Sequence, residues 1–130
     1  MSRLVSSSAL AGALLLAFIA GCSSQNHGSP AQLTDAITKA VYANDYAATT
    51  ANFDDQAKSQ VTRSSLGDLS DRMHRLGAYQ SLAQKNAEPD KGRYAFELTF
   101  DKGTAMAELR IDPDGKVGAY RVAFPAAPAK

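Results

Sequence analysis

The 130-residue sequence has a single cysteine, no excess of either charge and no apolar run long enough to cross a bilayer. A lone cysteine excludes an internal disulfide and a thiolate metal site. With 14 basic and 13 acidic side chains, the chain has no charge excess of the kind that nucleic acid binding requires. The apolar run at 9–20 is shorter than the roughly 20 residues of a transmembrane helix. Internal repeats, a glycine-flanked nucleophile elbow and a phosphate-cradling loop are also absent.

The N-terminal segment has the parts of a secretory signal in their usual order. Arg3 is the only charged side chain in residues 1–21, an apolar stretch follows it, and small residues close the segment. The last four residues resemble the lipobox of bacterial lipoproteins, the motif that signal peptidase recognises: Ile19, Ala20, Gly21 and Cys22. The resemblance implies cleavage before Cys22 and acyl chains on that cysteine. The alternatives are a plain signal peptide cut after Gly21 and a buried helix that ends in cysteine.

The lipoprotein resemblance also implies a location and a partner. Its sorting pattern places aspartate after the cysteine in inner-membrane lipoproteins, whereas this chain has Ser23. We therefore expect attachment to the outer membrane, facing the periplasm, with the membrane as partner through the acyl chains on Cys22. The composition predicts a polar flexible tether over 22–30, one folded domain over 31–124 and a disordered proline-alanine tail over 125–130.

The first half of the domain has the spacing of helices. Ser29, Pro30 and Gln32 predict a capping box with proline at the first helical position. Asn44-Asp45 ends this helix, and Asp45 can cap a second, short helix. A turn of helix around 57–61 and a longer helix from about Ser65, ended by Gly77, complete the helical half. Apolar residues at helical spacing define the expected buried faces: Leu33, Ile37, Ala40, Val41, Leu66, Leu69, Met73 and Leu76.

The second half alternates as strands do. A weak strand is expected over 79–85, a strong one over 93–100, and two more over about 105–111 and 117–124. Their inward residues have even, then odd, then even numbers, so each hairpin loop needs an even length or a bulge. Helices followed by an antiparallel meander predict an α+β fold, with the helices packed on a curved four-stranded antiparallel sheet.

Four short motifs resemble those of the small cystatin-like, nuclear transport factor 2-like domains. They are Asp45-Tyr46, Phe53-Asp54, Leu76-Gly77 and Asp114-Gly115-Lys116-Val117, and the resemblance spans about 31–124. It implies a cone-shaped fold with a pocket between helices and sheet, and dimerisation through the sheet. Some members are isomerases or dehydratases and many only bind, so the fold alone does not decide the function.

Two residues are weak candidates for catalysis. His74 lies at the edge of an apolar helical stripe, with Asp71 one turn earlier, and together they could form an acid-base dyad. The alternative, which we prefer, is a local pair on the helix rim. The five tyrosines could line a pocket, but they more often pack in a core with the hydroxyl reaching water.

No metal or cofactor is expected. Asp112 and Asp114 precede Gly115 as in a calcium loop, but the third acidic position and the distant glutamate are missing, and a type I turn explains the pattern. The pair Asp54-Asp55 is typical of a solvated boundary or a helix cap.

The outward face of the sheet is the other candidate site. Its charged residues are Glu97, Glu108, Arg110 and Arg121, separated by small and uncharged side chains. One interpretation is a solvated face with weak cross-strand ion pairs. The other is a dimer or partner interface anchored by Arg110 and Arg121.

Three functions follow from these alternatives. The main hypothesis is a lipid-anchored cell-envelope protein with a non-enzymatic binding or assembly domain. The second is a small-molecule enzyme, similar to an isomerase or dehydratase, that uses the cone pocket. The third is a structural spacer without a ligand.

Overall fold

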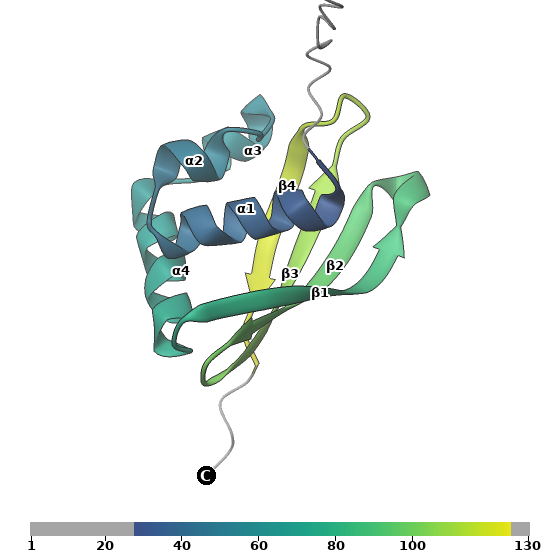
Figure 1. The fold of residues 1–130 in the computed structure, drawn as a ribbon. Helices are drawn as coiled ribbons and strands as arrows, with labels where there is room; N and C mark the ends of the chain where they lie inside the picture. Colours follow the sequence, from purple (N-terminus) through teal and green to yellow (C-terminus); the bar gives the residue numbers. More distant parts are fainter. Residues whose placement is uncertain (1–27, 126–130) are drawn as a thin grey trace, which may run out of the picture.

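The computed structural model describes residues 28–125. Four helices come first: α1 (Pro30–Tyr42), α2 (Tyr46–Thr50), α3 (Asp55–Gln60) and α4 (Arg63–Arg75). The strands follow: β1 (Tyr79–Glu88), β2 (Arg93–Phe100), β3 (Gly103–Ile111) and β4 (Val117–Ala123), with a 3-10 helix, η1 (Pro89–Lys91), between the first two. The sheet is an antiparallel meander in the order β1-β2-β3-β4 (Figure 1). The predicted α+β class and the four antiparallel strands are therefore confirmed.

Local side chains set the helix ends. Ser29 accepts the backbone N–H of Gln32 while the Gln32 side chain accepts the Ser29 N–H, so the predicted capping box is present. Asp45 caps α2 and Asp54 caps α3, each through its carboxylate. The fourth helix begins at Arg63, two residues earlier than predicted, because Thr62 serves as its cap. Each cap satisfies a backbone donor that the first helical turn leaves without a partner.

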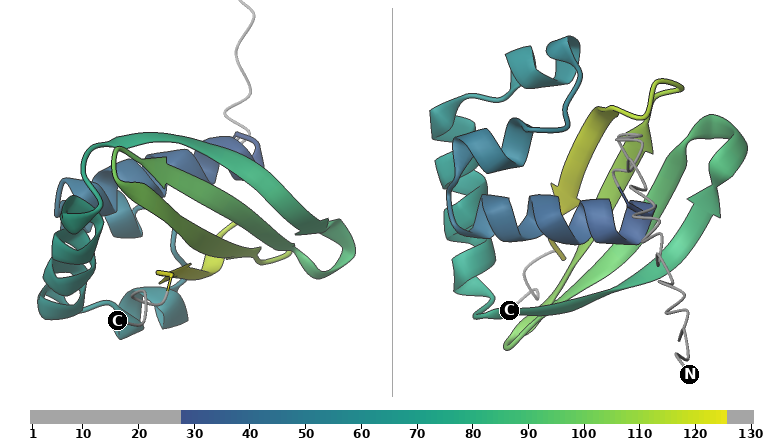
Figure 2. Two further views of the ribbon diagram at one scale, coloured as in Figure 1. Left: turned by 90° about the horizontal axis from the view of Figure 1, so that it is seen from below. Right: turned by 45° about the horizontal axis from the view of Figure 1, so that its top comes forward.

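The helices lie against one face of the sheet. α1 crosses this inner face and contacts β1 and β3, while α4 stands beside it and packs on α1 (Figures 1 and 2). Strand alternation and helical spacing turn their apolar residues toward the same space. The core cluster is formed by Leu33, Ile37, Val41, Phe53, Ala57, Leu66, Met73, Leu98, Phe100, Ala105, Ala107, Leu109 and Val117.

The hairpin loops follow the predicted parity rule. The β2–β3 turn has two residues, and Phe100 pairs with Gly103 across it. The β3–β4 turn has five residues and is followed by a register shift, because Arg110 pairs with Ala119 whereas Ile111 pairs with Val117. The bulge leaves Gly118 between the two pairs and turns Val117 fully into the core. Strict alternation along β4 predicts that Val117 points outward, because Tyr120 and Val122 point inward.

The first strand is longer than the sequence predicted. β1 continues past residue 85 to Glu88, which pairs with Arg93, and η1 then turns the chain into β2. Two register shifts interrupt the β1–β2 ladder, so its side-chain pattern is irregular. Polar edge residues can extend a strand because the ladder needs only their backbone groups, and this is why alternation did not reveal the extension.

Candidate functional site

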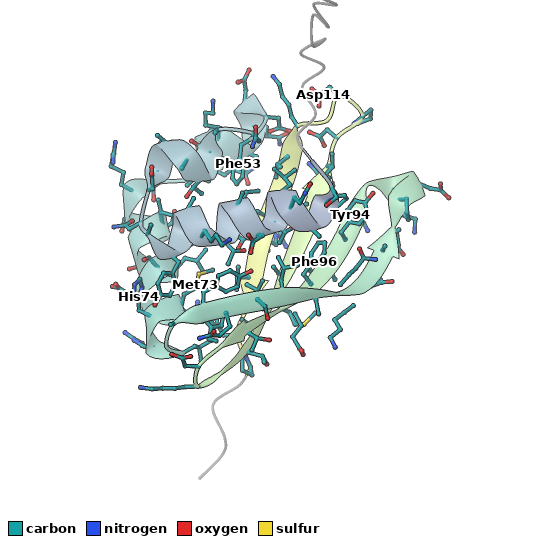
Figure 3. All side chains as sticks on the ribbon, in the orientation of Figure 1. Phe53, Met73, His74, Tyr94, Phe96 and Asp114 are labelled. Carbon is teal, nitrogen blue, oxygen red and sulfur yellow. The ribbon has the colours of Figure 1, made fainter. Side chains whose placement is uncertain are left out.

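The two candidate residues His74 and Asp71 are both exposed on α4, and Figure 3 shows the position of His74. The His74 Nδ1 lies 2.8 Å from the Ser70 carbonyl oxygen, and its ring stacks on Tyr42 with the centroids 3.9 Å apart. Within residues 28–125, no hydrogen bond or ion pair joins His74 to Asp71. The contacts of His74 are therefore those of a side chain that fastens α4 to α1.

The tyrosine hydroxyls connect separate elements. Tyr120 and Thr38 share a hydrogen bond of 2.8 Å between β4 and α1, and Tyr79 donates to Asp35 over 2.8 Å. Burial raises the pKa of both tyrosines, and for Tyr79 the Asp35 carboxylate adds to the effect. In the described part of the chain, every buried side-chain nitrogen and oxygen has a hydrogen-bond partner. These hydroxyls hold helices on the sheet.

Two carboxyl groups meet where the β3–β4 turn approaches α3. The pKa of Asp54 lies below its usual range, because its carboxylate accepts the Ala57 N–H over 2.6 Å and a hydrogen bond from Asp112. The pKa of Asp112 is raised by its hydrogen bond to Asp54 and by burial and the nearby charge of Asp54. Residues 28–125 contain no cluster of three or more acidic or metal-ligating side chains that could hold a metal ion. The two carboxyls can share one proton.

This pair predicts a pH effect on stability. Because the pKa of Asp112 is raised in the folded protein, this carboxyl stabilises the fold at pH values below its ordinary pKa. That stabilisation is lost as the pH rises through the folded pKa. The lowered pKa of Asp54 contributes stability above its ordinary value, which is lost as the pH falls through the folded pKa. We expect Asp112→Asn to abolish the loss on the alkaline side, because the amide cannot ionise and still donates to Asp54. Urea denaturation from acidic to neutral pH measures this.

The matched control for that experiment is Asp114→Asn. Asp114 lies in the same turn, but its carboxylate accepts the Lys116 N–H and does not bond Asp54. Because the Asp114 charge is the smallest of the contributions that raise the pKa of Asp112, this variant should keep most of the wild-type dependence on pH. If Asp112→Asn keeps it too, the carboxyl pair does not control stability.

A cleft of about 250 Å³ runs along β4 on the helix side of the sheet. Phe53, Leu66 and Leu69 line it from the helical half, and Tyr120 and Arg121 line it from β4. α4 does not cover β4 closely, which leaves Tyr120 and Val122 of that strand half-buried. The lining mixes apolar side chains with polar ones such as Gln60 and Ser65, and its only titratable residues are Tyr120 and Arg121.

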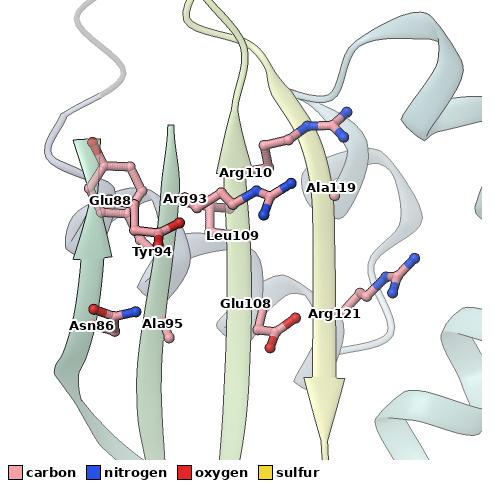
Figure 4. Close-up of a pocket in the computed structure, with 10 residues that line it drawn as sticks. All are labelled: Asn86, Glu88, Arg93, Tyr94, Ala95, Glu108, Leu109, Arg110, Ala119 and Arg121. Atoms are coloured by element: carbon pink, nitrogen blue, oxygen red, sulfur yellow. The ribbon is translucent and has the colours of Figure 1, made fainter. Parts of the chain in front are cut away.

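A larger concavity, of about 440 Å³, lies on the outer face of the sheet; we call it the arginine groove (Figure 4). Its guanidinium groups come from three strands: Arg93 from β2, Arg110 from β3 and Arg121 from β4. Ala95 and Ala119 are the small residues of the lining, and Glu108 lies between Ala95 and Arg121 in the register. The full lining is Asn86, Glu88, Arg93, Tyr94, Ala95, Glu108, Leu109, Arg110, Ala119 and Arg121.

Arg110 is fixed at the end of the groove. Its Nε lies 3.4 Å from Asp112 Oδ1, and one terminal nitrogen donates to the Gly118 carbonyl oxygen over 3.1 Å. Gly118 permits this position, because a side chain at 118 would overlap both Arg110 and Asp112. The bulge that buries Val117 therefore also holds Arg110 in place.

The structure brings three of the four expected interface residues together. Arg110, Arg121 and Glu108 line the groove, whereas Glu97 lies outside it and pairs with Lys85 at 3.7 Å. Arg93 was not among the expected interface residues. The alternation along β2 predicts that the Arg93 side chain points outward, but its position opposite Arg110 follows only from the β2–β3 register.

The expected lipidation and peptidase sites, Ile19 to Cys22, lie outside the described residues. Among the helices of residues 28–125, none is both long and apolar enough to cross a membrane. Comparison with known proteins finds no matching family model, curated protein or solved structure.

Proposed function

We infer that this chain is a bacterial lipoprotein, held in the cell envelope by acyl chains on Cys22. The support is the run from Ile19 to Cys22, which follows an apolar stretch and precedes a polar tether. Two or more acyl chains hold a protein stably on a membrane, because each buried methylene contributes about 0.8 kcal/mol. Ser23 in place of aspartate favours the outer membrane, with the domain facing the periplasm.

The folded domain, in this proposal, is nuclear transport factor 2-like and binds a partner without transforming it. The observation that carries this is the contrast between the two faces of the sheet. On the inner face, packed side chains such as Leu98 and Ala107 are fully buried. On the outer face, three arginines and two glutamates are among the residues that line an open groove. A rigid sheet with an open, charged concavity is suited to recognition.

A small-molecule enzyme is the alternative, and it would use the cleft beside β4. General acid-base catalysis needs a group that titrates near the working pH. Neither titratable residue of the cleft meets this need, because the pKa of Tyr120 is raised and arginine stays charged. The binding function is therefore the better supported of the two.

The test is site-specific photo-crosslinking of the full chain in cells. A photoreactive residue at Asn86, exposed at the rim of the arginine groove, should form a crosslink to an envelope protein or to a second copy of this chain. Arg121→Ala should weaken that crosslink, because it removes a charged anchor from the groove.

The control position is Ala47, exposed on α2 away from the groove. A crosslink to a second copy would indicate a homodimer through the sheet, and a crosslink to another protein would indicate an envelope partner. Identical products from Asn86 and Ala47 would contradict a specific binding face. Absence of any crosslink from Asn86 would favour the structural spacer.

A further inference from the structure

The hydrogen bonds of β3 show which backbone groups of β4 are already paired. The Ile111 N–H donates to the Gly92 carbonyl oxygen, so it points to the β2 side of β3. Successive residues of a strand direct their backbone groups to opposite sides. The even-numbered residues of β3 therefore face β4, and their partners from Ala119 to Ala123 are the odd-numbered residues of that strand.

The free edge of β4 carries the backbone groups of Tyr120 and Val122. These residues alternate with the paired ones, so their N–H and C=O groups point away from β3. At the start of the strand the same edge is occupied: the Val117 N–H donates to the Asn52 carbonyl oxygen over 2.8 Å, and the Val117 carbonyl oxygen accepts the Asp54 N–H over 2.9 Å. Asp54 then caps α3, and this pairing ends. In the part of the chain that the structure describes, no backbone group pairs with the edge beyond Val117.

The cleft on the helix side of β4 adjoins this free edge, because residues 118–121 form its β4 lining. Phe53, Leu66 and Leu69 line it from the helical half, together with polar side chains such as Gln60. Its volume of about 250 Å³ lies below the range of about 300–1,000 Å³ that is typical of small-molecule sites. The cleft therefore suits individual side chains of a longer partner.

Arg121 places a positive charge beside the free edge. Its guanidinium group extends past β4 on the outer side of the sheet (Figure 4). Glu108 lies opposite it in the register, but among the ion pairs of residues 28–125 none joins these two side chains. Antiparallel pairing with the same edge of a second copy would place the two Arg121 side chains directly or diagonally opposite each other, which is destabilising. An acidic side chain at that place would be stabilised instead.

We propose that the free edge of β4 binds an extended segment of a partner protein, in which acidic residues alternate with apolar ones, as an added strand. The backbone groups of Tyr120 and Val122 pair with the segment. Successive side chains of a strand point to opposite faces, so the apolar ones enter the cleft and the acidic ones meet Arg121. The proposal goes beyond the proposed function, because it concerns the strand edge and stands without the arginine groove.

The opposite edge of the sheet is less suited to pairing. The ladder of β1 to β2 has two register shifts, and the second lies at Lys85. Bulges and lysine side chains are features that hinder the pairing of an edge strand. From Ala119 to Ala123, β4 pairs with β3 without a shift, so its outer edge is regular.

The experiment titrates the full chain, in non-ionic detergent micelles, with the synthetic peptide acetyl-Ser-Leu-Glu-Leu-Glu-Leu-Ser-amide. Amide hydrogen exchange, followed by NMR, is the readout. In the free protein, the N–H groups of Tyr120 and Val122 should exchange faster than those of Ala119 and Arg121, which bond to β3. At a peptide concentration of about ten times the Kd, exchange at Tyr120 and Val122 should slow about tenfold.

Control peptides separate backbone pairing from general attraction. A peptide with lysine in place of glutamate should bind more weakly, because Arg121 repels it. Two further peptides carry N-methyl groups, one on its leucines and the other on its glutamates. Binding should be lost in one of these two, because only one set of N–H groups faces β4.

Variants of the protein test the same two contributions. Arg121→Ala should weaken binding of the glutamate peptide about threefold, and Arg121→Glu should reverse the preference toward the lysine peptide. Val122→Pro removes an N–H from the free edge and should abolish binding, while the β3–β4 ladder does not use that group. The matched control is Arg93→Glu, which reverses an exposed charge on β2 and should leave the preference for the glutamate peptide unchanged.

Three outcomes would overturn the inference: no slowing at Tyr120 and Val122, equal binding of the lysine peptide, or equal binding of both N-methylated peptides and their parent. Slowing that depends on protein concentration alone would place a second copy at the edge and would overturn it too. Loss of peptide binding while the Asn86 crosslinks persist removes this inference alone. Peptide binding without those crosslinks removes the groove partner and leaves the strand edge as the binding surface.

Discussion

Cys22→Ser should release the protein from the membrane or leave it as an unprocessed precursor. The serine hydroxyl cannot form the thioether that carries the lipid, and a peptidase that acts on the lipidated cysteine then has no substrate. The remaining apolar run, 9–20, is too short to serve as a stable membrane span. Labelling of cells with radioactive palmitate, followed by membrane fractionation, measures both lipid attachment and location. We expect complete loss of the label.

The matched control for the anchor is Ser23→Asp, which changes the next residue and keeps the cysteine. This variant should stay lipidated and processed but move to the inner membrane, in line with the sorting pattern of bacterial lipoproteins. A Cys22→Ser chain that is still processed normally and membrane-bound would refute the lipoprotein assignment.

Gly92→Ala should destabilise the domain strongly, because neither the backbone conformation nor the space at this position suits a side chain. Gly92 follows η1 with a φ of 64°, in the left-handed region, where a residue with a side chain is strained by about 1–3 kcal/mol. A Cβ at this position would also overlap the backbone carbonyl oxygen of Ile111. That backbone is fixed, because the Ile111 N–H donates to the Gly92 carbonyl oxygen over 2.8 Å. Chemical denaturation measures the loss.

The control with the opposite sign is Gly67→Ala. Gly67 lies inside α4, and no atom stands within 4 Å of the position that its Cβ would take. Alanine there should raise the free energy of unfolding by about 0.5–1 kcal/mol, because glycine is the poorer helix former. If both substitutions changed the free energy of unfolding in the same direction, Gly92 would not have the left-handed conformation that the β1–β2 connection requires.

Much of the fold could be predicted from local patterns in the sequence. The Ser29–Gln32 capping box and the Asp45 cap involve residues close in the chain, so short-range hydrogen bonding determines them. Alternation along β2 and β3 predicted which side chains face the core, and Leu98, Ala105 and Leu109 are buried there. The parity rule also predicted that an odd hairpin loop requires a bulge.

The remaining features depend on contacts between distant parts of the chain. The extension of β1 to Glu88 comes from pairing with Arg93, which alternation within β1 does not encode. The connection between α2 and α3 meets β4 through a bridge between Phe53 and Val117, and the Val117 N–H donates to the Asn52 carbonyl oxygen over 2.8 Å. Such contacts join segments that are distant in the sequence, so the local pattern of either segment does not reveal them.

By itself, the sequence determined the order and type of the main elements and the inward and outward sides of the strands, and it carries the resemblance to a lipobox at Cys22. Each of these depends on residues that lie within a few positions of one another. Only the tertiary structure decided that Arg93, Arg110 and Arg121 share one groove, and that His74 stacks on Tyr42. The physical reason is that the backbone hydrogen bonds of a sheet place residues from distant parts of the chain side by side, and the bulge at Gly118 shifts the register of the last β3–β4 pair.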